Sequence, residues 1–204
     1  MNRNEKIKRR YNRISRIYEV MDKMIKAEWR LNLLSNVSGD VLEVGIGTGT
    51  NLHFYPNHTK SLTGVDFSKG MLKQARQKVT KGRYPFPIEL IEADIQKMPF
   101  PDNTFDTVVS TCVFCSVPDP LSGLEELKRV CKPGGQILML EHMRSEQKWV
   151  GMVMDVLNPL TVKLWGANIN RETIHTIERS GLKIEKNKNL RGTIFRELSV
   201  SPNK

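Results

Sequence analysis

A short apolar run that ends in three alternating glycines constrains the fold of this chain more than any other feature. The run covers 41–44, the glycines are Gly45, Gly47 and Gly49, and a second apolar run ends at Asp66. The first run predicts a strand buried on both faces, and glycines let the backbone approach a ligand without a clash from Cβ. An acidic residue about twenty residues after such a loop can accept hydrogen bonds from a ribose. The segment therefore predicts a nucleotide-type cofactor site.

The loop departs from the dinucleotide fingerprint, because that pattern has glycine three residues after its second glycine and Thr50 stands there. NAD is therefore disfavoured. The loop instead resembles that of the class I S-adenosylmethionine (SAM) methyltransferases, in which an acidic residue, here Glu43, stands two residues before the first glycine. Further segments resemble later motifs of that superfamily in the same order. They are Ala93-Asp94-Ile95, the stretch 98–106, and Lys132-Pro133-Gly134-Gly135-Gln136.

The resemblance implies a single-domain α/β protein with the Rossmann-like, seven-stranded class I methyltransferase fold, and 204 residues suit one such domain. Alternating elements in the sequence agree with it. Strands are expected near 40–45, 61–66, 87–92, 106–112, 136–142, 182–187 and 194–200, and helices near 69–80, 120–131 and 170–180. The turn-rich stretch 187–192 predicts that the last two strands form an antiparallel hairpin at one edge.

The resemblance also implies SAM as the cofactor and S-adenosyl-L-homocysteine as its product. The expected cofactor-binding residues are Tyr11, Glu43, Gly45, Gly47, Gly49, Asn51, Asp66, Phe67, Met71, Asp94, Ile95 and Thr111. In this assignment the glycine backbone lies near the methionine carboxylate, Asp66 binds ribose, and Phe67 and Met71 pack on adenine. Each feature taken alone has a structural alternative, because a glycine loop can be a plain turn and Asp66 can cap a helix.

Methyl transfer from a sulfonium mainly requires that two reactants be positioned, and proximity and orientation can supply about 7–11 kcal/mol. His142, at the end of the fifth expected strand, is the candidate proton acceptor, since its ordinary pKa near 6.5 suits that task. A strand-end histidine satisfied by a neighbouring carboxylate is the alternative. By analogy with the resembled families, Tyr18 could reach the sulfonium. Cys112 and Cys115 form a lone CxxC that is expected to pack in the core, and no metal is predicted.

The N-terminal segment is basic and amphipathic. Residues 1–30 hold ten Lys and Arg against four Asp and Glu, in a chain of net charge +10. The apolar side chains recur at alternating steps of four and three, at Ile7, Tyr11, Ile14, Tyr18, Met21 and Ile25. The pattern predicts a helix within 1–35 that covers the cofactor pocket as a lid. It is equally typical of a helix that lies on an anionic membrane, and one helix can do both.

Residues 36–204 are then the SAM-binding domain, with an insertion at 145–168 that is unusually rich in Trp, Met and Leu. The insertion follows the fifth strand, beside the carboxyl ends where open α/β sheets bind ligands. We expect it to bind a lipophilic acceptor, although packing against the N-terminal helix would explain its composition equally well.

The acceptor is suggested only by wider resemblances. The stretches 113–117, 141–143 and 166–172 are similar to animal methyltransferase-like proteins that methylate small thiols at membranes. The basic N-terminus and the short length resemble bacterial phosphatidylethanolamine N-methyltransferases and, more distantly, menaquinone and ubiquinone C-methyltransferases. Phosphatidylethanolamine N-methylation is the favoured activity, with thiol S-methylation and quinone C-methylation as alternatives.

Two interpretations of other classes remain. A nucleic-acid methyltransferase is disfavoured, because the chain has Ser110-Thr111-Cys112-Val113 where an Asn-Pro-Pro-Tyr-like motif would stand. A non-catalytic, membrane-associated SAM-binding protein stays open. The sequence lacks an apolar run of the roughly twenty residues that span a bilayer, and three cysteines favour a reducing compartment. We therefore expect a cytoplasmic protein, peripheral on the inner face of the membrane, whose oligomeric state is open.

Overall fold

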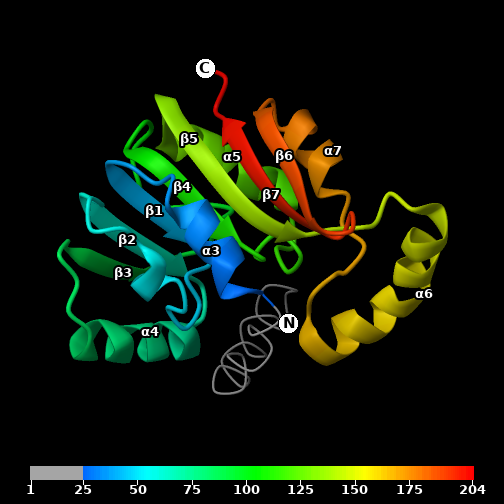
Figure 1. Ribbon diagram of the computed structural model, residues 1–204, viewed down its shortest axis with the longest axis horizontal. Helices are drawn as coiled ribbons and strands as arrows, with labels where there is room; N and C mark the ends of the chain where they lie inside the picture. The colour runs from blue at the N-terminus through cyan, green and yellow to red at the C-terminus, as the bar shows by residue number, and fades with distance from the viewer. Residues whose placement is uncertain (1–24) are drawn as a thin grey trace.

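A seven-stranded sheet in the order β3-β2-β1-β4-β5-β7-β6 forms the centre of the protein, whose computed structural model describes residues 25–204 (Figure 1). The strands are β1 (Asp40–Val44), β2 (Ser61–Asp66), β3 (Ile88–Glu92), β4 (Phe105–Thr111), β5 (Cys131–His142), β6 (Lys183–Arg191) and β7 (Phe195–Ser201). The helices are α3 (Ala27–Leu34), α4 (Lys69–Lys81), α5 (Pro120–Val130), α6 (Lys148–Trp165) and α7 (Thr173–Arg179), with a short 3-10 helix η1 (Leu52–Phe54). This is the Rossmann-like methyltransferase architecture expected from the sequence.

The strand order reverses between β1 and β4. Strands β1 to β5 pair in parallel, whereas β7 pairs antiparallel with both β5 and β6. In an open parallel sheet, such a reversal leaves a crevice at the carboxyl ends of the two central strands, because their connections leave in opposite directions. The fold therefore prepares a ligand site above β1 and β4.

The expected edge hairpin is confirmed, but its turn lies later in the chain. Strand β6 continues to Arg191, through most of the stretch 187–192 that was expected to turn. The chain reverses at 192–194, where Gly192 has a φ of 55°. That left-handed conformation favours glycine, which explains why the turn lies at Gly192.

Strand β5 begins at Cys131, five residues before the expected start. Its pairing with β4 jumps from Cys131 to Gln136, so the segment between them bulges. A Cβ on Gly135 would lie 2.8 Å from the backbone oxygen of Asp106, so glycine permits this close approach. Helix α5 ends at Val130, one residue before the expected end at 131.

Helices cover both faces of the sheet and enclose two apolar clusters. Alternate residues of a strand point to opposite faces, so neighbouring residues of β1 and β4 enter different clusters. One cluster lies under α5 and α7 and includes Leu42, Val108, Leu124, Leu127 and Ile177. The other lies under α3 and α4 and includes Leu33, Leu34, Val41, Leu72 and Val109. Figure 1 shows α3 and α5 on opposite faces of the sheet.

The expected N-terminal lid helix lies mostly outside the described residues, and its described end differs from expectation. Lys26 is extended, with φ −63° and ψ 141°, and α3 begins only after it. The last part of the segment 1–35 is therefore a separate helix, α3. Helix α3 buries Trp29, Leu33 and Leu34 against the sheet, so it belongs to the core of the domain.

The expected insertion at 145–168 is mostly helix α6, which stands away from the sheet in Figure 1. Gly166 ends it with a φ of 79°, as is common after a helix. Within residues 25–204, no helix combines the length and the apolar character that crossing a bilayer requires.

Candidate cofactor site

A pocket opens at the carboxyl ends of β1, β2, β3 and β4, where the strand order reverses. Its empty space, counted out to the open mouth, is about 650 Å³. The lining residues are Gly45, Gly47, Asp66, Phe67, Met71, Asp94, Ile95, Gln96, Cys112, Val113, Ser116, Val117 and Pro118. Seven of them are expected cofactor residues, and six are not.

The glycine loop forms one wall of this pocket and needs glycine for two different reasons. Gly45 and Gly47 have φ values of 64° and 58°, and a Cβ on Gly45 would lie 2.6 Å from a methyl carbon of Val113. These two glycines keep the wall thin beside the pocket. A Cβ on Gly49 would instead lie 2.7 Å from Leu52, so Gly49 allows tight packing inside the domain. Gly49 is not among the lining residues.

Asp66 ties the loop to the end of β2. Its Oδ2 accepts a hydrogen bond from the Gly47 amide at 3.0 Å, and its Oδ1 accepts one from the Ser68 amide at 2.8 Å. Each carboxylate oxygen has a second lone pair, so the side chain can also accept from a ribose. The alternative of a helix cap is resolved, because Ser68 caps α4 by accepting from the Met71 amide.

Burial perturbs this carboxyl group. Asp66 is 6% exposed, and burial raises its pKa to about 6 although its two backbone hydrogen bonds oppose the rise. Desolvation disfavours the charged form of an acid, and hydrogen bonds to the carboxylate favour it. A ligand that donates hydroxyl groups to Asp66 would add to the second effect.

Asp94 and Gln96 form the wall opposite the glycine loop. Gln96 donates through its side-chain amide to both carboxylate oxygens of Asp94, at 2.8 and 3.0 Å. The Gln96 side-chain oxygen accepts from the Asp119 amide, at the start of α5. The sequence did not single out Gln96, which fixes the orientation of the expected Asp94.

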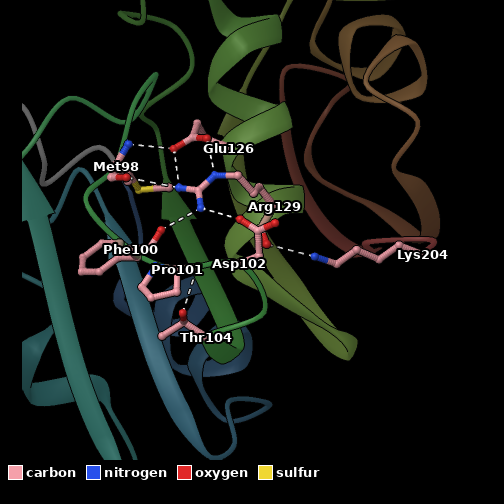
Figure 2. Close-up of polar contacts among 8 residues, drawn as sticks. All are labelled: Met98, Phe100, Pro101, Asp102, Thr104, Glu126, Arg129 and Lys204. Carbon is pink, nitrogen blue, oxygen red and sulfur yellow. Dashed lines mark hydrogen bonds and ion pairs between the residues drawn. The ribbon is translucent and has the colours of Figure 1, made fainter.

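Arg129 on α5 holds the segment that follows this wall (Figure 2). Its guanidinium donates to the Glu126 carboxylate at 2.6 and 2.9 Å and to the Phe100 and Met98 carbonyls at 2.7 and 3.2 Å. It also pairs with Asp102 at 2.8 Å, while Glu126 accepts from the Met98 amide. One side chain thus fastens the 98–102 segment to a helix of the core.

Three expected cofactor residues lie beneath the glycine loop and are not among the lining residues of the pocket. Glu43 is 2% exposed and accepts from the Asn51 side-chain amide at 2.7 Å and from the Tyr55 hydroxyl at 3.0 Å. Asn51 also donates to the Thr111 hydroxyl at 3.0 Å and accepts from Arg30 of α3. This buried network joins α3, β1, β4 and the loop, so Glu43, Asn51 and Thr111 support the site from below.

The expected proton acceptor His142 lies on the sheet face that α3 covers. Its ring packs edge-on against Phe195 with the centroids 5.0 Å apart, and burial lowers its pKa. It is absent from the pocket lining. Two further expected site residues, Tyr11 and Tyr18, lie outside the described residues.

Glu141, beside His142 in the sequence, points to the opposite face and supports the far wall of the pocket. It accepts from the Ser110 hydroxyl at 2.6 Å and from the Val113 amide at 3.2 Å. Burial raises its pKa to about 7, and its Oε2 has no hydrogen-bond partner among residues 25–204. A protonated carboxyl group suits such an environment.

The CxxC pair lies at this same wall, and Cys112 packs against the apolar cluster under α3 and α4, as expected, while it also faces the pocket. Cys112, with a φ of 53°, lines the pocket. Cys115 donates its thiol to the Cys112 carbonyl at 3.3 Å, and burial raises its pKa to about 12, which keeps it protonated. Within residues 25–204, no group of three or more side chains is placed to hold a metal ion.

One feature of the sequence could have predicted that residues 112–118 form a wall of the pocket. It follows the strand that lies beside β1, and the carboxyl ends of neighbouring parallel strands face the same crevice. The order of strands in the sheet, which identifies β4 as that neighbour, comes from the structure.

The chain matches known methyltransferases over most of its length. The methyltransferase domain family matches residues 42–139. A phosphatidylethanolamine N-methyltransferase of Cereibacter sphaeroides is 41% identical over 109 residues, which are 53% of each chain. A demethylmenaquinone methyltransferase of Protochlamydia amoebophila is 31% identical over 197 residues, 86% of this chain and 81% of the relative.

The chain spans only part of the length of several curated relatives, namely 53% to 62% of the first three that it matches. Among solved structures, a SAM-dependent methyltransferase of Thermotoga maritima, titled a possible histamine N-methyltransferase, superposes with a TM-score of 0.71 at 19% identity. That match covers 97% of this chain and 100% of the other. The fold, the glycine loop with its acidic partner, and these relatives together show that the chain belongs to the class I SAM-dependent methyltransferases.

Proposed function

We propose that this protein transfers a methyl group from SAM to the amine of a phospholipid, phosphatidylethanolamine being the favoured acceptor, at a membrane surface. The observation that carries the methyl-transfer part is the pocket, in which Asp66 and the glycine loop meet at the switch point of the sheet. The support for the acceptor is the 41% identity to a phosphatidylethanolamine N-methyltransferase.

The pocket residues fit this cofactor in chemistry. Asp66 supplies a buried carboxylate for the ribose hydroxyls, and Gly45 and Gly47 line the pocket with backbone that carries no Cβ. Phe67, Met71 and other apolar side chains supply flat or adaptable surfaces for adenine. When bound, SAM supplies a methyl carbon already activated by a sulfonium, whose sulfur leaves as a neutral thioether.

The chain's own residues then have three tasks. The glycine loop and Asp66 hold one reactant in a fixed position, which is the main source of rate in this kind of transfer. The wall at 112–118 limits the space left for the acceptor. An amine must also lose a proton. His142 stays our proposed acceptor on the sequence argument alone, because its ring packs against Phe195 and is not among the lining residues of the pocket.

A second candidate, quinone C-methylation, is favoured by one specific observation. The demethylmenaquinone methyltransferase of Protochlamydia amoebophila aligns with 86% of this chain, much more than the phospholipid methyltransferase does. Thiol S-methylation and non-catalytic SAM binding are the further alternatives to be tested.

The test is to incubate the purified full chain with methyl-labelled SAM and three acceptors offered separately. These are vesicles containing phosphatidylethanolamine, a demethylated menaquinone in detergent, and a panel of small thiols. Label in the phospholipid alone would support the proposal, whereas label in the quinone or in a thiol alone would replace the acceptor. SAM binding without transfer to any acceptor would refute the proposed activity.

The matched controls are two aspartate variants. Asp66→Asn removes a carboxylate of the pocket, so it should weaken SAM binding and reduce transfer at a SAM concentration that saturates the wild type only. Asp102→Asn makes the same chemical change at a side chain that is 69% exposed and pairs with Arg129. It should leave transfer unchanged, so that a loss in both variants would signal damage to the fold.

A further inference from the structure

Helix α6 carries an exposed apolar face. Within the described residues, seven of the eight large apolar side chains left exposed lie on this one helix. They are Trp149, Met152, Val153, Val156, Leu157, Leu160 and Leu164. Trp149 and Val156 are the most open, with 80% and 77% of their surface exposed. A contiguous apolar patch of this kind marks an interaction surface.

The seven side chains form one stripe along the whole helix. Their spacing by three and four residues places them on a common face, because an α-helix turns once in 3.6 residues. The opposite face, which includes Met154 and Thr161, is buried against the rest of the protein. Helix α6 is therefore docked through one face, and within residues 25–204 its second, apolar face is exposed.

The charges around this stripe are positive. Lys148 and Lys163 stand near the two ends of the helix, and the chain as a whole carries a net charge of +10. The single acidic residue of α6, Asp155, lies beside the stripe and is paired with Arg144 at 2.8 Å. An apolar face with cations at its borders complements a lipid surface that bears anionic headgroups.

The connector after α6 is joined to the pocket wall. The backbone and side-chain amides of Asn168 both donate to the Cys115 carbonyl, at 2.8 and 3.1 Å. Arg171 donates to the Val117 carbonyl at 2.7 Å. These bonds hold the 112–118 wall from the side of α6, so a surface bound to the helix is positioned relative to the mouth of the pocket.

We propose that the exposed face of α6 inserts into the interface of an anionic lipid membrane and holds the pocket next to it. The helix lies in the plane of the interface, with the apolar stripe among the acyl chains and the lysines among the headgroups. The proposal concerns α6 alone and does not depend on residues 1–24. The proposal rests on the proposed function, because it explains how an acceptor that resides in the membrane reaches the site.

The test is binding of the full chain to sedimentable vesicles, without SAM or acceptor. One set contains phosphatidylcholine alone and the other contains phosphatidylcholine and phosphatidylglycerol in equal parts. The double variant Val156→Gln with Leu160→Gln removes two apolar side chains, and glutamine is a good helix former. We expect its partition onto the mixed vesicles to fall about a hundredfold, since burying each of the two side chains accounts for roughly tenfold.

The chain offers a matched control in Leu31, which is 52% exposed on α3. Leu31→Gln removes the same kind of side chain from another surface and should bind vesicles like the wild type. Replacement of Lys148 and Lys163 by glutamine should reduce the gain that phosphatidylglycerol gives over phosphatidylcholine. Melting temperature and SAM affinity of every variant should match the wild type, which shows that the fold is intact.

The proposal is overturned if the α6 variant binds vesicles as well as the wild type, or if Leu31→Gln weakens binding equally. It is also overturned if the α6 variant only changes a dimer into a monomer, since the face would then bind a second copy. Because vesicle binding is measured without methyl transfer, its outcome is distinct from that of the proposed activity. Label that reaches no lipid while the α6 variant loses vesicle binding would refute the activity alone.

Discussion

Asp66 should make SAM binding depend on pH, and the dependence should vanish in Asp66→Asn. The free protein holds this carboxyl group with a pKa of about 6. Hydroxyl donors of a ribose favour the ionised form, so binding lowers the pKa of Asp66 and releases a proton when the solution is near or below pH 6. The affinity for SAM therefore falls as pH falls through this range, by about tenfold per pH unit once the free group is protonated.

The size of the effect at neutral pH follows from the hydrogen bonds. A bond to a charged group contributes about 1.5–3 kcal/mol, against about 1 kcal/mol for a neutral one. The Asp66→Asn side chain would keep one carbonyl oxygen but would present an amide group to a backbone N–H that now donates to the carboxylate. We expect a loss of about 2–3 kcal/mol, which weakens binding about 30- to 150-fold.

Calorimetry with SAM from about pH 5 to about pH 8 measures both effects, because it covers both sides of the pKa. Buffers of different ionisation enthalpy should reveal proton release in the wild type and none in Asp66→Asn. Asp102→Asn serves as the control. A flat pH profile in the wild type, or wild-type affinity in Asp66→Asn, would refute this account of the ribose contact.

Three further predictions concern stability, each measured by urea unfolding. Gly64→Ala places a Cβ 2.3 Å from the side chain of Ile46 and should cost about 1–3 kcal/mol, while Gly134→Ala meets nothing within 4 Å and should be neutral; equal effects would contradict the packing argument. Arg129→Met leaves the Phe100 and Met98 carbonyls of Figure 2 without their donor and should cost about 2–3 kcal/mol of stability. Wild-type stability in this variant would show that the hydrogen bonds of Arg129 are dispensable. Folding raises the pKa of Glu141 from 4.5 to about 7, so the stability that this group contributes is fully present below pH 4.5 and is lost as pH rises through 7. Glu141→Gln should remove this pH-dependent loss, which is worth at most about 3 kcal/mol. A pH profile of stability that is unchanged in the variant would count against the buried acid.

Much of the site follows from local sequence alone. An apolar run that enters a glycine loop, and an acidic residue that ends the next run, predict a buried parallel strand and a ligand beside its carboxyl end. Asp66, Phe67 and Asp94, three of the expected cofactor residues, all line the pocket, because each ends a strand of the parallel sheet or follows it within two residues.

The supporting network was beyond sequence reasoning. Arg30, Glu43, Asn51 and Thr111 are far apart along the chain and meet only because β1 and β4 are neighbours and α3 covers their common face. The sequence motif includes Glu43 but does not tell whether its side chain meets the ligand or the underside of the loop. That choice depends on which face of the strand the residue occupies once the sheet has formed.

Helix α6 shows most clearly which properties follow from the sequence and which follow only from the tertiary structure. The excess of Trp, Met and Leu at 145–168 is visible in the sequence, and it suits a core helix, an acceptor site or a lipid contact equally well. Only the packing of α6 shows that one apolar face is buried and a second lies open. Composition and periodicity determine which residues share a face, but exposure is a property of what the rest of the fold places against that face, and only the tertiary structure decides it.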